Sequence, residues 1–222
     1  MIWTFKKKKY PDYWEAYLQH FEKKEKKTLE LSRFVALDTE TTGFDFYIDR
    51  ILSIGAVSIV GNEISVAESL EIYLKQSHFN PESVPIHGIR QHGMTTKFSE
   101  EDAMKQFLNY IEDAVLIAHH ASFDIQMINA ALNRMDLPNL KNKVIDTMDL
   151  YANTRIKSNF IDKRAQYSLD DIAEAYAINL IDRHTAPGDA LIAALIFLKT
   201  TALLKKSKSF KLEHYFLKSN RF

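Results

Sequence analysis

Two carboxylates follow an apolar strand in residues 33–43, Arg-Phe-Val-Ala-Leu-Asp-Thr-Glu-Thr-Thr-Gly. Because side chains alternate along a strand, Asp38 and Glu40 are expected on one face and their apolar neighbours on the other. Neighbouring carboxylates at the end of a buried strand repel each other and lose hydration unless a cation or a shared proton neutralises them. The pair therefore predicts a metal site, although an isolated pair could also be a solvated strand end before a turn.

Two more acids stand at the ends of predicted elements. Asp124 follows a short buried strand, residues 115–118, and Asp189 lies in the first turn of the last predicted helix. Carboxylates from separate elements can hold two Mg²⁺ or Mn²⁺ ions, about 3.5–4 Å apart, for an in-line phosphoryl displacement. His184 lies just before that helix, and a histidine with an ordinary pKa of about 6.5 can take a proton from a metal-activated water.

These residues form an ordered series of motifs that resembles the DEDD superfamily of 3′–5′ exonucleases. The resemblance is to the DEDDh branch, typified by the DnaQ-like proofreading (epsilon) subunit of bacterial replicative DNA polymerase. It covers roughly residues 33–200. The matching segments are Asp-Thr-Glu-Thr-Thr-Gly at 38–43, Ala-His-His-Ala-Ser-Phe-Asp at 118–124, His-Thr-Ala-Pro-Gly-Asp-Ala at 184–190 and the loop at 80–89.

The resemblance implies a ribonuclease H-like fold and stepwise hydrolysis of the 3′-terminal phosphodiester of single-stranded or frayed DNA, releasing nucleoside 5′-monophosphates. It also implies a role for each motif residue. Asp38, Glu40 and Asp189 would hold the tighter cation. Asp38 would bridge to a second cation, which Asp124 would reach directly or through water. His184 would be the general base.

Substrate-binding candidates come from the same comparison of motifs. In the family, the residues that match Glu82 and His87 contact the terminal nucleotide. Thr41, Gly43 and Phe44, within and just after the first motif, are further candidates. Each of these assignments is an expectation that rests on the resemblance.

Three other positions leave alternatives open. His120 departs from the family pattern, which commonly has Asn there, and we expect it to tune substrate contact or else to turn into the core. His119 and His120 are adjacent and leave a strand in different directions, so we do not expect them to ligate one metal together. Phe44 and Tyr47 could stack on a nucleobase or could cover the edge of the core.

The elements that must position these residues follow from hydrophobic periodicity. We expect a helix over 11–27, a meander of strands at 33–38, 51–60 and 63–74, and a long loop over 75–98. Helices are expected after Ser99, after Asp124, after Ser168 and from Pro187, with strands at 115–118 and 144–145 between them. This order predicts an α/β fold in which a mixed, ribonuclease H-like sheet, three meander strands and then parallel strands, is flanked by helices.

Charge suggests a division into a basic helical extension (1–30), an exonuclease domain (31–204) and a basic tail (205–222). Residues 1–30 carry eight Lys against five acids, and residues 199–222 carry seven Lys or Arg against one acid. The remainder has fourteen basic and twenty-three acidic residues. The lysines at 6–9, 205, 206 and 208 could contact phosphates or could be solvated tails.

Composition excludes several classes of protein. The chain has no cysteine, so disulfides, thiolate nucleophiles and cysteine zinc sites are excluded. We find no leader pattern and expect no stretch approaching a membrane span, so the predicted location is cytoplasmic. The predicted partners are single-stranded DNA or 3′ ends, with association to a DNA polymerase possible. RNA as the substrate, or a non-catalytic module that binds nucleic acid or a polymerase, are the alternatives, and the oligomeric state is not predicted.

Overall fold

A single mixed sheet forms the centre of the computed structural model, which describes residues 9–22, 32–89, 96–155 and 167–218. Its six strands lie in the order β4-β3-β2-β1-β5-β6. They are β1 (Arg33–Thr41), β2 (Ile51–Val60), β3 (Glu63–Leu74), β4 (Lys97–Phe98), β5 (Val115–Ala118) and β6 (Val144–Asp146). β1, β2 and β3 form an antiparallel meander, whereas β5 runs parallel to both β1 and β6.

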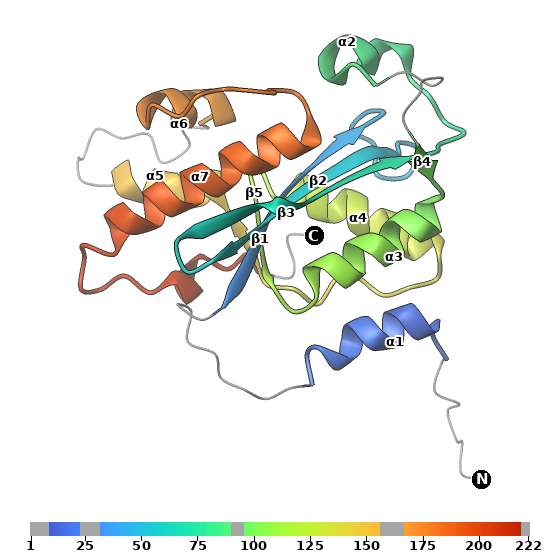
Figure 1. The fold of residues 1–222 in the computed structure, drawn as a ribbon, viewed down its shortest axis with the longest axis horizontal. Coiled ribbons are helices and arrows are strands. Elements are labelled where there is room, and N and C mark those ends of the chain that lie inside the picture. The colour runs from blue at the N-terminus through green and yellow to red at the C-terminus, as the bar shows by residue number, and fades with distance from the viewer. Residues whose placement is uncertain (1–8, 23–31, 90–95, 156–166, 219–222) are drawn as a thin grey trace.

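Helices cover both faces of this sheet (Figure 1). They are α1 (Asp12–Gln19), α2 (Val84–His87), α3 (Glu100–Ile111), α4 (Ser122–Arg134), α5 (Thr147–Arg155), α6 (Leu169–Ala175) and α7 (Ala186–Leu204). α7 lies on one face with α5 and α6 beside it, and α3 and α4 lie on the other. Two 3₁₀ turns, η2 (Pro81–Ser83) and η3 (Leu212–Tyr215), complete the described elements. The predicted ribonuclease H-like architecture is confirmed.

Both faces of β1 are buried before the strand reaches its acids. Val35 and Leu37 belong to the core formed with α3 and α4, whereas Phe34 and Ala36 belong to the core beneath α7. The alternation continues through the end of the strand, so Asp38 and Glu40 should lie on the α7 side. The sheet therefore presents both carboxylates to the beginning of α7.

Three predicted elements differ from the structure at their ends. The helix expected over 11–27 ends at Gln19 and continues only as a turn to residue 22, and its predicted remainder from residue 23 lies outside the described residues. β1 continues to Thr41, so its acids lie within the strand. The expected loop at 75–98 contains η2, α2 and β4. Asn80 caps η2 by accepting a hydrogen bond from the Glu82 amide, and β4 pairs with β3.

α7 is buried on several sides. Leu191, Leu195 and Leu198 are only half-buried, whereas Ala194 and Phe197 pack against the sheet. The other side of the helix packs with α5 and α6. Among the described residues α7 alone is long and apolar enough to cross a membrane by length and composition, and more than half of it is buried inside the fold. The expectation that no stretch approaches that length was wrong, because a helix packed on several sides is apolar nearly all round.

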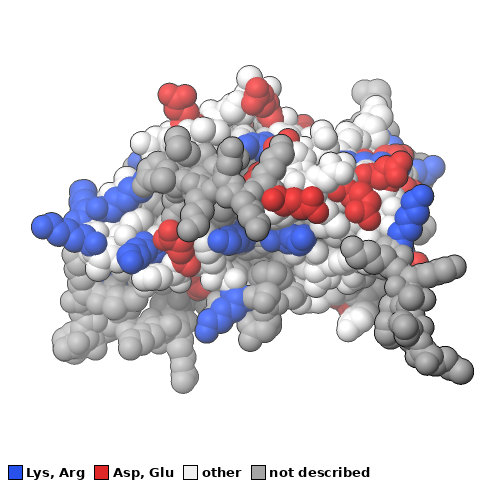
Figure 2. Space-filling view, turned by 90° about the horizontal axis from the view of Figure 1, so that it is seen from below, with Lys and Arg blue, Asp and Glu red and all other residues white. Residues whose placement is uncertain are grey.

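The residues predicted as a basic tail fold back onto the domain in their described part, 205–218. Phe210 and Leu212 pack into the core beneath α7. Phe216 forms an antiparallel bridge with Ile145, and the Leu217 amide donates to the Val144 carbonyl. Figure 2 shows Lys and Arg gathered at the end of its face where α7 ends, with charges of both signs elsewhere. These lysines are thus held in place on a folded segment, while the three-part division of the chain stays a prediction.

Candidate active site

Three carboxylates meet where the end of β1 faces the first turn of α7. Ligand atoms of Asp38, Glu40 and Asp189 all lie within 4.8 Å of one another. Thr185 caps the helix by accepting a hydrogen bond from the Gly188 amide at 3.2 Å, which sets Asp189 in the first turn. The prediction that the two β1 acids share a face is confirmed by this geometry.

The close approach of α7 to the sheet depends on a glycine that the sequence analysis did not single out. Gly55 on β2 pairs directly with Asp38 in the antiparallel register. A Cβ atom at Gly55 would lie 2.1 Å from the Ala186 carbonyl carbon and 2.2 Å from the Pro187 nitrogen. Only a residue without a side chain allows the helix to begin here, and a glycine inside a strand is a known signal of close backbone approach.

Replacing Gly55 with alanine is therefore expected to move Asp189 away from Asp38. We expect stability to fall by about 1–3 kcal/mol from overpacking, and activity to fall about 10²-fold for a displacement near 1 Å. Chemical denaturation and kcat/KM measure the two effects. Gly61→Ala is the matched control, because Gly61 has φ +62° but no atom near its Cβ position, so it should cost stability without loss of kcat/KM. Equal activity losses in both variants would contradict this role of Gly55.

Asp124 approaches this cluster from the first turn of α4. It is buried, and its Oδ1 atom accepts hydrogen bonds from the amide and the hydroxyl of Thr39, at 2.9 and 2.7 Å. Thr39 points away from the two β1 acids and thereby fixes the fourth acid beside them. The sequence analysis did not predict this contact, although Thr39, a residue with a hydroxyl group, lies between Asp38 and Glu40 in the first motif.

Burial raises the pKa of each of these acids, and repulsion between them raises the pKa of Asp38 and Glu40 further. Burial, followed by the charges of Asp189 and Asp124, raises the pKa of Glu40 to about 7. Burial raises the pKa of Asp124 to about 7, although the Thr39 hydrogen bonds oppose it. The pKa of Asp38 lies well above its usual range because of burial and then the charges of Asp124, Asp189 and Glu40. Without a cation, the folded chain therefore holds protons that the unfolded chain would release.

We expect the thermal stability of the metal-free protein to fall as pH rises. Acids with a raised folded-state pKa stabilise the fold fully below the unfolded pKa, near ~4, and this contribution is lost as pH rises through about 7, the pKa of Glu40 and Asp124. Each 1 kcal/mol lost should lower Tm by about 2–4 °C in a chain of this size. Calorimetry in EDTA between pH 5 and 8 measures the decrease. It should be smaller in Asp38→Asn, and an equal slope in both proteins would contradict its origin in these acids.

Arg183 is a cation in this site that the sequence analysis missed. Its Nη1 atom contacts Asp189 Oδ2, and its Nε atom lies 2.6 Å from Asp170 Oδ1 on α6. The other carboxylate oxygen of Asp189, Oδ1, is buried and has no hydrogen-bond partner among the described residues. An orphaned carboxylate oxygen facing two more acids fits a divalent cation, which prefers hard oxygen ligands.

His184 lies beside these acids at the turn before α7. Its side chain is exposed, its φ is +64°, and its Nδ1 atom lies 3.4 Å from Arg183 Nη1. A residue other than glycine in this left-handed region costs about 1–3 kcal/mol, and such strain is concentrated at functional sites. The turn therefore holds an imidazole at the solvent side of the acidic cluster.

Comparison with known proteins identifies the family. The profile of the family described as Exonuclease (RNase T) matches residues 35–197, most of the chain. The chain belongs to this exonuclease family. This result confirms the family resemblance seen in the motifs.

Relatives of this exonuclease-family chain include bacterial replication proteins. It is 32% identical over 183 residues to the DNA polymerase III subunit epsilon of Salmonella typhimurium, covering 77% of this chain and 72% of that protein. It is also 32% identical over 173 residues to the PolC-type DNA polymerase III of Thermotoga maritima, covering 78% of this chain. The chain spans only 12% of that polymerase.

Solved structures share the fold. The E. coli exonuclease I complex with a dT13 oligonucleotide has a TM-score of 0.66 at 17% identity, covering 79% of this chain and 42% of that one. Exonuclease X in complex with 5′ overhanging duplex DNA has a TM-score of 0.60 at 20% identity, covering 83% and 97%. At these identities the likeness concerns the fold alone.

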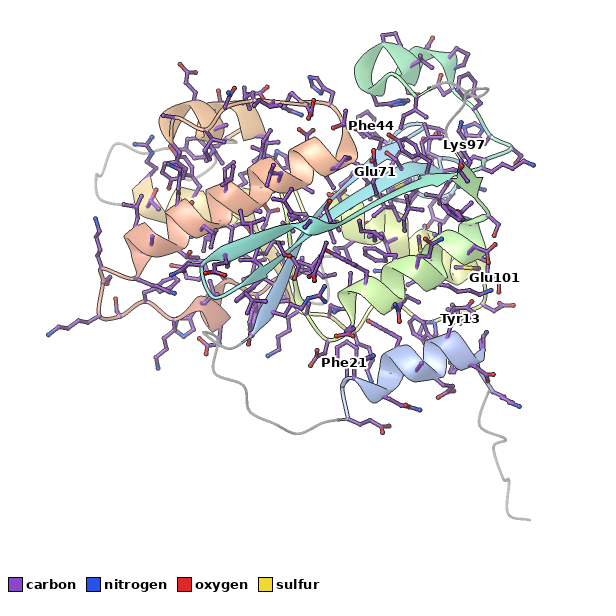
Figure 3. All side chains as sticks on the ribbon, in the orientation of Figure 1. Tyr13, Phe21, Phe44, Glu71, Lys97 and Glu101 are labelled. Carbon is purple, nitrogen blue, oxygen red and sulfur yellow. The ribbon has the colours of Figure 1, made fainter. Side chains whose placement is uncertain are left out.

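The predicted substrate-binding residues of this exonuclease-family chain surround the end of β1. Thr41 donates its hydroxyl to the Gly43 carbonyl at 2.8 Å, and a Cβ at Gly43 would lie 2.4 Å from the Asp49 carboxylate. Figure 3 shows Phe44 at the end of the sheet, away from Tyr13 of α1. Phe44 is 82% exposed, and one side of its ring packs against Phe123, with the ring centroids 5.6 Å apart. Its role in binding stays a prediction.

The segment expected to contact the terminal nucleotide is tied to β1 through Asn80, whose Nδ2 atom donates to the Thr42 carbonyl at 3.0 Å. Glu82 is exposed on η2. His87 is buried, its Nδ1 atom accepts from the Ile89 amide at 3.0 Å, and burial lowers its pKa. The structure thus places Glu82 at the surface and His87 largely inside, and contact with a nucleotide stays a prediction for both.

The two adjacent histidines do not separate as expected, because the centroids of their rings lie only 4.6 Å apart. The expectation that they do not ligate one metal together stays a prediction. His119 is half-buried and its Nδ1 atom lies 2.9 Å from the Thr147 hydroxyl, while burial lowers its pKa to about 4. His120 is exposed with φ +55°, so the alternative in which it turns into the core was wrong. Asp146 holds this turn by accepting from the His120 and Ala121 amides. The sequence analysis did not predict that Asp146, the last residue of β6, would accept hydrogen bonds from this turn.

Proposed function

We propose that this chain is a metal-dependent 3′–5′ exonuclease that acts on single-stranded or frayed DNA and releases nucleoside 5′-monophosphates. The observation that carries the proposal is the meeting of Asp38, Glu40 and Asp189 within 4.8 Å, with His184 at the adjacent turn. Membership of the exonuclease family supports the reaction. The relatives named as polymerase III epsilon and the neighbours solved with single-stranded or overhanging DNA support the substrate.

Each acid has a proposed part in holding two divalent cations, Mg²⁺ or Mn²⁺. Asp38, Glu40 and Asp189 would hold the tighter ion, Asp38 would bridge to the second, and Asp124 would reach the second directly or through water. All the donors are carboxylate oxygens, which these ions prefer to nitrogen or sulfur. When bound, the cations supply polarisation of the phosphate and of the attacking water.

The chain's own residues then manage the proton and the substrate. His184 takes a proton from the attacking water, whose oxygen bonds to phosphorus while the P–O3′ bond breaks. The departing O3′ atom keeps the electron pair of the broken bond and takes a proton from solvent. The products are a nucleoside 5′-monophosphate and a strand shortened by one nucleotide with a new 3′-hydroxyl. Glu82, His87, Thr41, Gly43 and Phe44 are proposed to hold the terminal nucleotide.

An RNA exonuclease of the same branch is the second candidate, and contacts to the 2′-hydroxyl would distinguish it from a DNA exonuclease. A non-catalytic module is disfavoured, since the four acids and the histidine of the motifs are all present. The replication relatives favour association with a DNA polymerase and a cytoplasmic location, and both are part of the proposal.

Labelled oligonucleotides test the function directly. DNA and RNA strands labelled at the 3′ or 5′ end would be incubated with Mg²⁺, Mn²⁺ or EDTA, and the products sized. We expect a 3′ label to be released at once as a mononucleotide and a 5′ label to remain on a descending ladder, on DNA more than on RNA. Undiminished activity in EDTA, or a ladder from the 5′ end, would overturn the proposal.

Lysines at the end of α7 are expected to contribute sequence-independent binding. Lys205, Lys206 and Lys208 begin sixteen residues beyond Asp189, about 24 Å along the helix and the turn that follows it. Replacing them with Gln should reduce the salt slope of single-strand binding by roughly 0.7 for each lost phosphate contact. Lys105→Gln is the control, because its charge is paired with Glu101 on α3. A salt slope equal to that of the control would show that these lysines are solvated and do not contact phosphates.

A further inference from the structure

A hollow lies between the loop after β1 and the outer face of α4. Its volume is about 430 Å³, within the range of ligand sites. Two aromatic residues and four amides line it: Phe46, Tyr47, Gln126, Asn129, Asn133 and Asn139. None of these residues belongs to the acidic cluster or to the predicted substrate-binding set.

The loop that forms one wall of this hollow is fixed by its own polar groups. The Asp49 carboxylate accepts from the Thr42 hydroxyl at 2.6 Å and from the Asp45 amide at 2.9 Å. Arg50 donates to the carbonyls of Tyr47 and Ile48, at 3.1 and 2.6 Å. The backbone is thus preorganised, which lowers the entropy cost of binding.

This fixed loop presents an aromatic ring to solvent. Tyr47 is 91% exposed, and its neighbour Ile48 is 58% exposed. Large apolar side chains gathered on a rigid surface loop are typical of an interaction site. An exposed tyrosine ring is also a platform on which a nucleobase can stack. The alternative role of Tyr47, covering the core edge, was wrong.

The opposite wall contains a donor without a partner. Asn129 on α4 is only 4% exposed, and its Oδ1 atom accepts from the Leu140 amide at 2.9 Å. Its Nδ2 atom has no hydrogen-bond partner among the described residues. A buried unsatisfied donor costs stability unless a ligand supplies an acceptor. The ring oxygens and nitrogens of a nucleobase are acceptors of this kind.

The charges of the hollow favour a base over a phosphate. Arg134 also lines it, but its Nε and Nη2 atoms are bound to the Glu100 carboxylate at 3.0 and 2.7 Å. The remaining polar groups, apart from the tyrosine hydroxyl, are neutral amides, which can both donate and accept. Aromatic rings with neutral amides suit the face and the edge of an unpaired base.

The hollow is also connected with the catalytic end of α4. A neighbouring hollow of about 380 Å³ shares Phe46 and Gln126 with it and reaches His120 beside the second motif. Asp124 lies in the first turn of α4, and Asn133 follows nine residues later, about 13 Å along the helix axis. A strand with its 3′ end at the acids could therefore pass along α4.

We propose that this hollow is a nucleobase subsite for an unpaired base of the substrate strand, upstream of the nucleotide being removed. The inference rests on the proposed exonuclease function. It adds to that function a residue, Tyr47, that contacts an upstream base and neither the scissile phosphate nor the terminal nucleotide. If a base binds in this hollow, kcat/KM should depend on the length of the strand and on the presence of a base at the position that reaches the hollow.

An abasic scan tests the subsite. A series of single-stranded oligonucleotides would carry one abasic position each, moved stepwise from the 3′ end, and kcat/KM would be measured. For the unmodified chain we expect a decrease of about 5-fold or more at one or two adjacent internal positions, the lower range of base stacking on an aromatic ring. In Tyr47→Ala that position-specific decrease should disappear, because the stacking partner is already lost.

Two controls keep the result interpretable. Val66→Ala removes another exposed apolar side chain, on β3, and should reproduce the unmodified scan. Hydrolysis of thymidine 5′-(p-nitrophenyl) phosphate by the unmodified chain, a substrate with no upstream base, tests the proposed function alone. Suppose that the unmodified chain hydrolyses this ester, so that the proposed function holds. An abasic scan without a position-specific decrease, or a scan that is the same in Tyr47→Ala, would then overturn the subsite alone.

Discussion

Asp38→Asn is expected to lower kcat about 10³-fold or more, with the fold intact. Asp38 is the residue proposed to contact both cations, and its carboxylate lies within 4.8 Å of ligand atoms of Glu40 and Asp189. A neutral amide cannot replace a shared carboxylate, so several kcal/mol of transition-state stabilisation should be lost, at 1.36 kcal/mol for each tenfold in rate. Kinetics at saturating Mg²⁺ measures the effect.

The same substitution should stabilise the metal-free protein at neutral pH. Burial and three neighbouring acids raise the pKa of Asp38, and an amide removes both the repulsion and the proton that it holds. Glu63→Gln, at an exposed acid beyond the opposite end of β1, is the control and should change neither property. Retention of more than a tenth of kcat by Asp38→Asn would contradict the assignment.

His184→Asn is expected to lower kcat by about 10²–10⁴-fold, the usual contribution of a general base. Asparagine is chosen because it tolerates the left-handed backbone at φ +64° better than alanine. The acid limb of the pH–rate profile should flatten, because the general base has been removed, while binding of the cations is kept.

The comparison with His184→Ala separates chemistry from strain. Alanine should cost additional stability at the positive φ, yet both variants should lose similar activity if the imidazole is the base. His214→Asn, at an exposed histidine on η3, is the matched control and should keep full activity. A change in kcat of less than a few-fold in His184→Asn would show that another group takes the proton.

Local periodicity predicted the part of the site that lies within one element. The alternation of β1 is enough to place Asp38 and Glu40 on one face, and a helix that begins near Pro187 is enough to place Asp189 in its first turn. Their meeting depends on Gly55, a contact between segments far apart in the sequence that no local pattern specifies. The order of the family motifs supplied that information where periodicity could not.

The contacts that sequence analysis missed are long-range side-chain pairs. Arg183 reaches Asp170 on another helix, and Thr39 reaches Asp124 across 85 positions. The docking of residues 205–218 was not predicted, because Phe210 and Phe216, which pack this segment against the domain, are isolated apolar residues without a period. Packing of single aromatic residues becomes visible only once the surface that receives them is formed.

The bridge between Phe216 and Ile145 has a consequence for solubility. β6 has only three residues and is the last strand of its sheet, so its outer side would present unpaired backbone groups to other molecules. On that side Phe216 bridges to Ile145, the Leu217 amide donates to the Val144 carbonyl, and the Phe216 ring packs on the core. The segment therefore blocks edge-to-edge pairing of this sheet with another molecule. A chain cut after residue 204 should therefore keep its acids but form sheet-paired aggregates as its concentration rises.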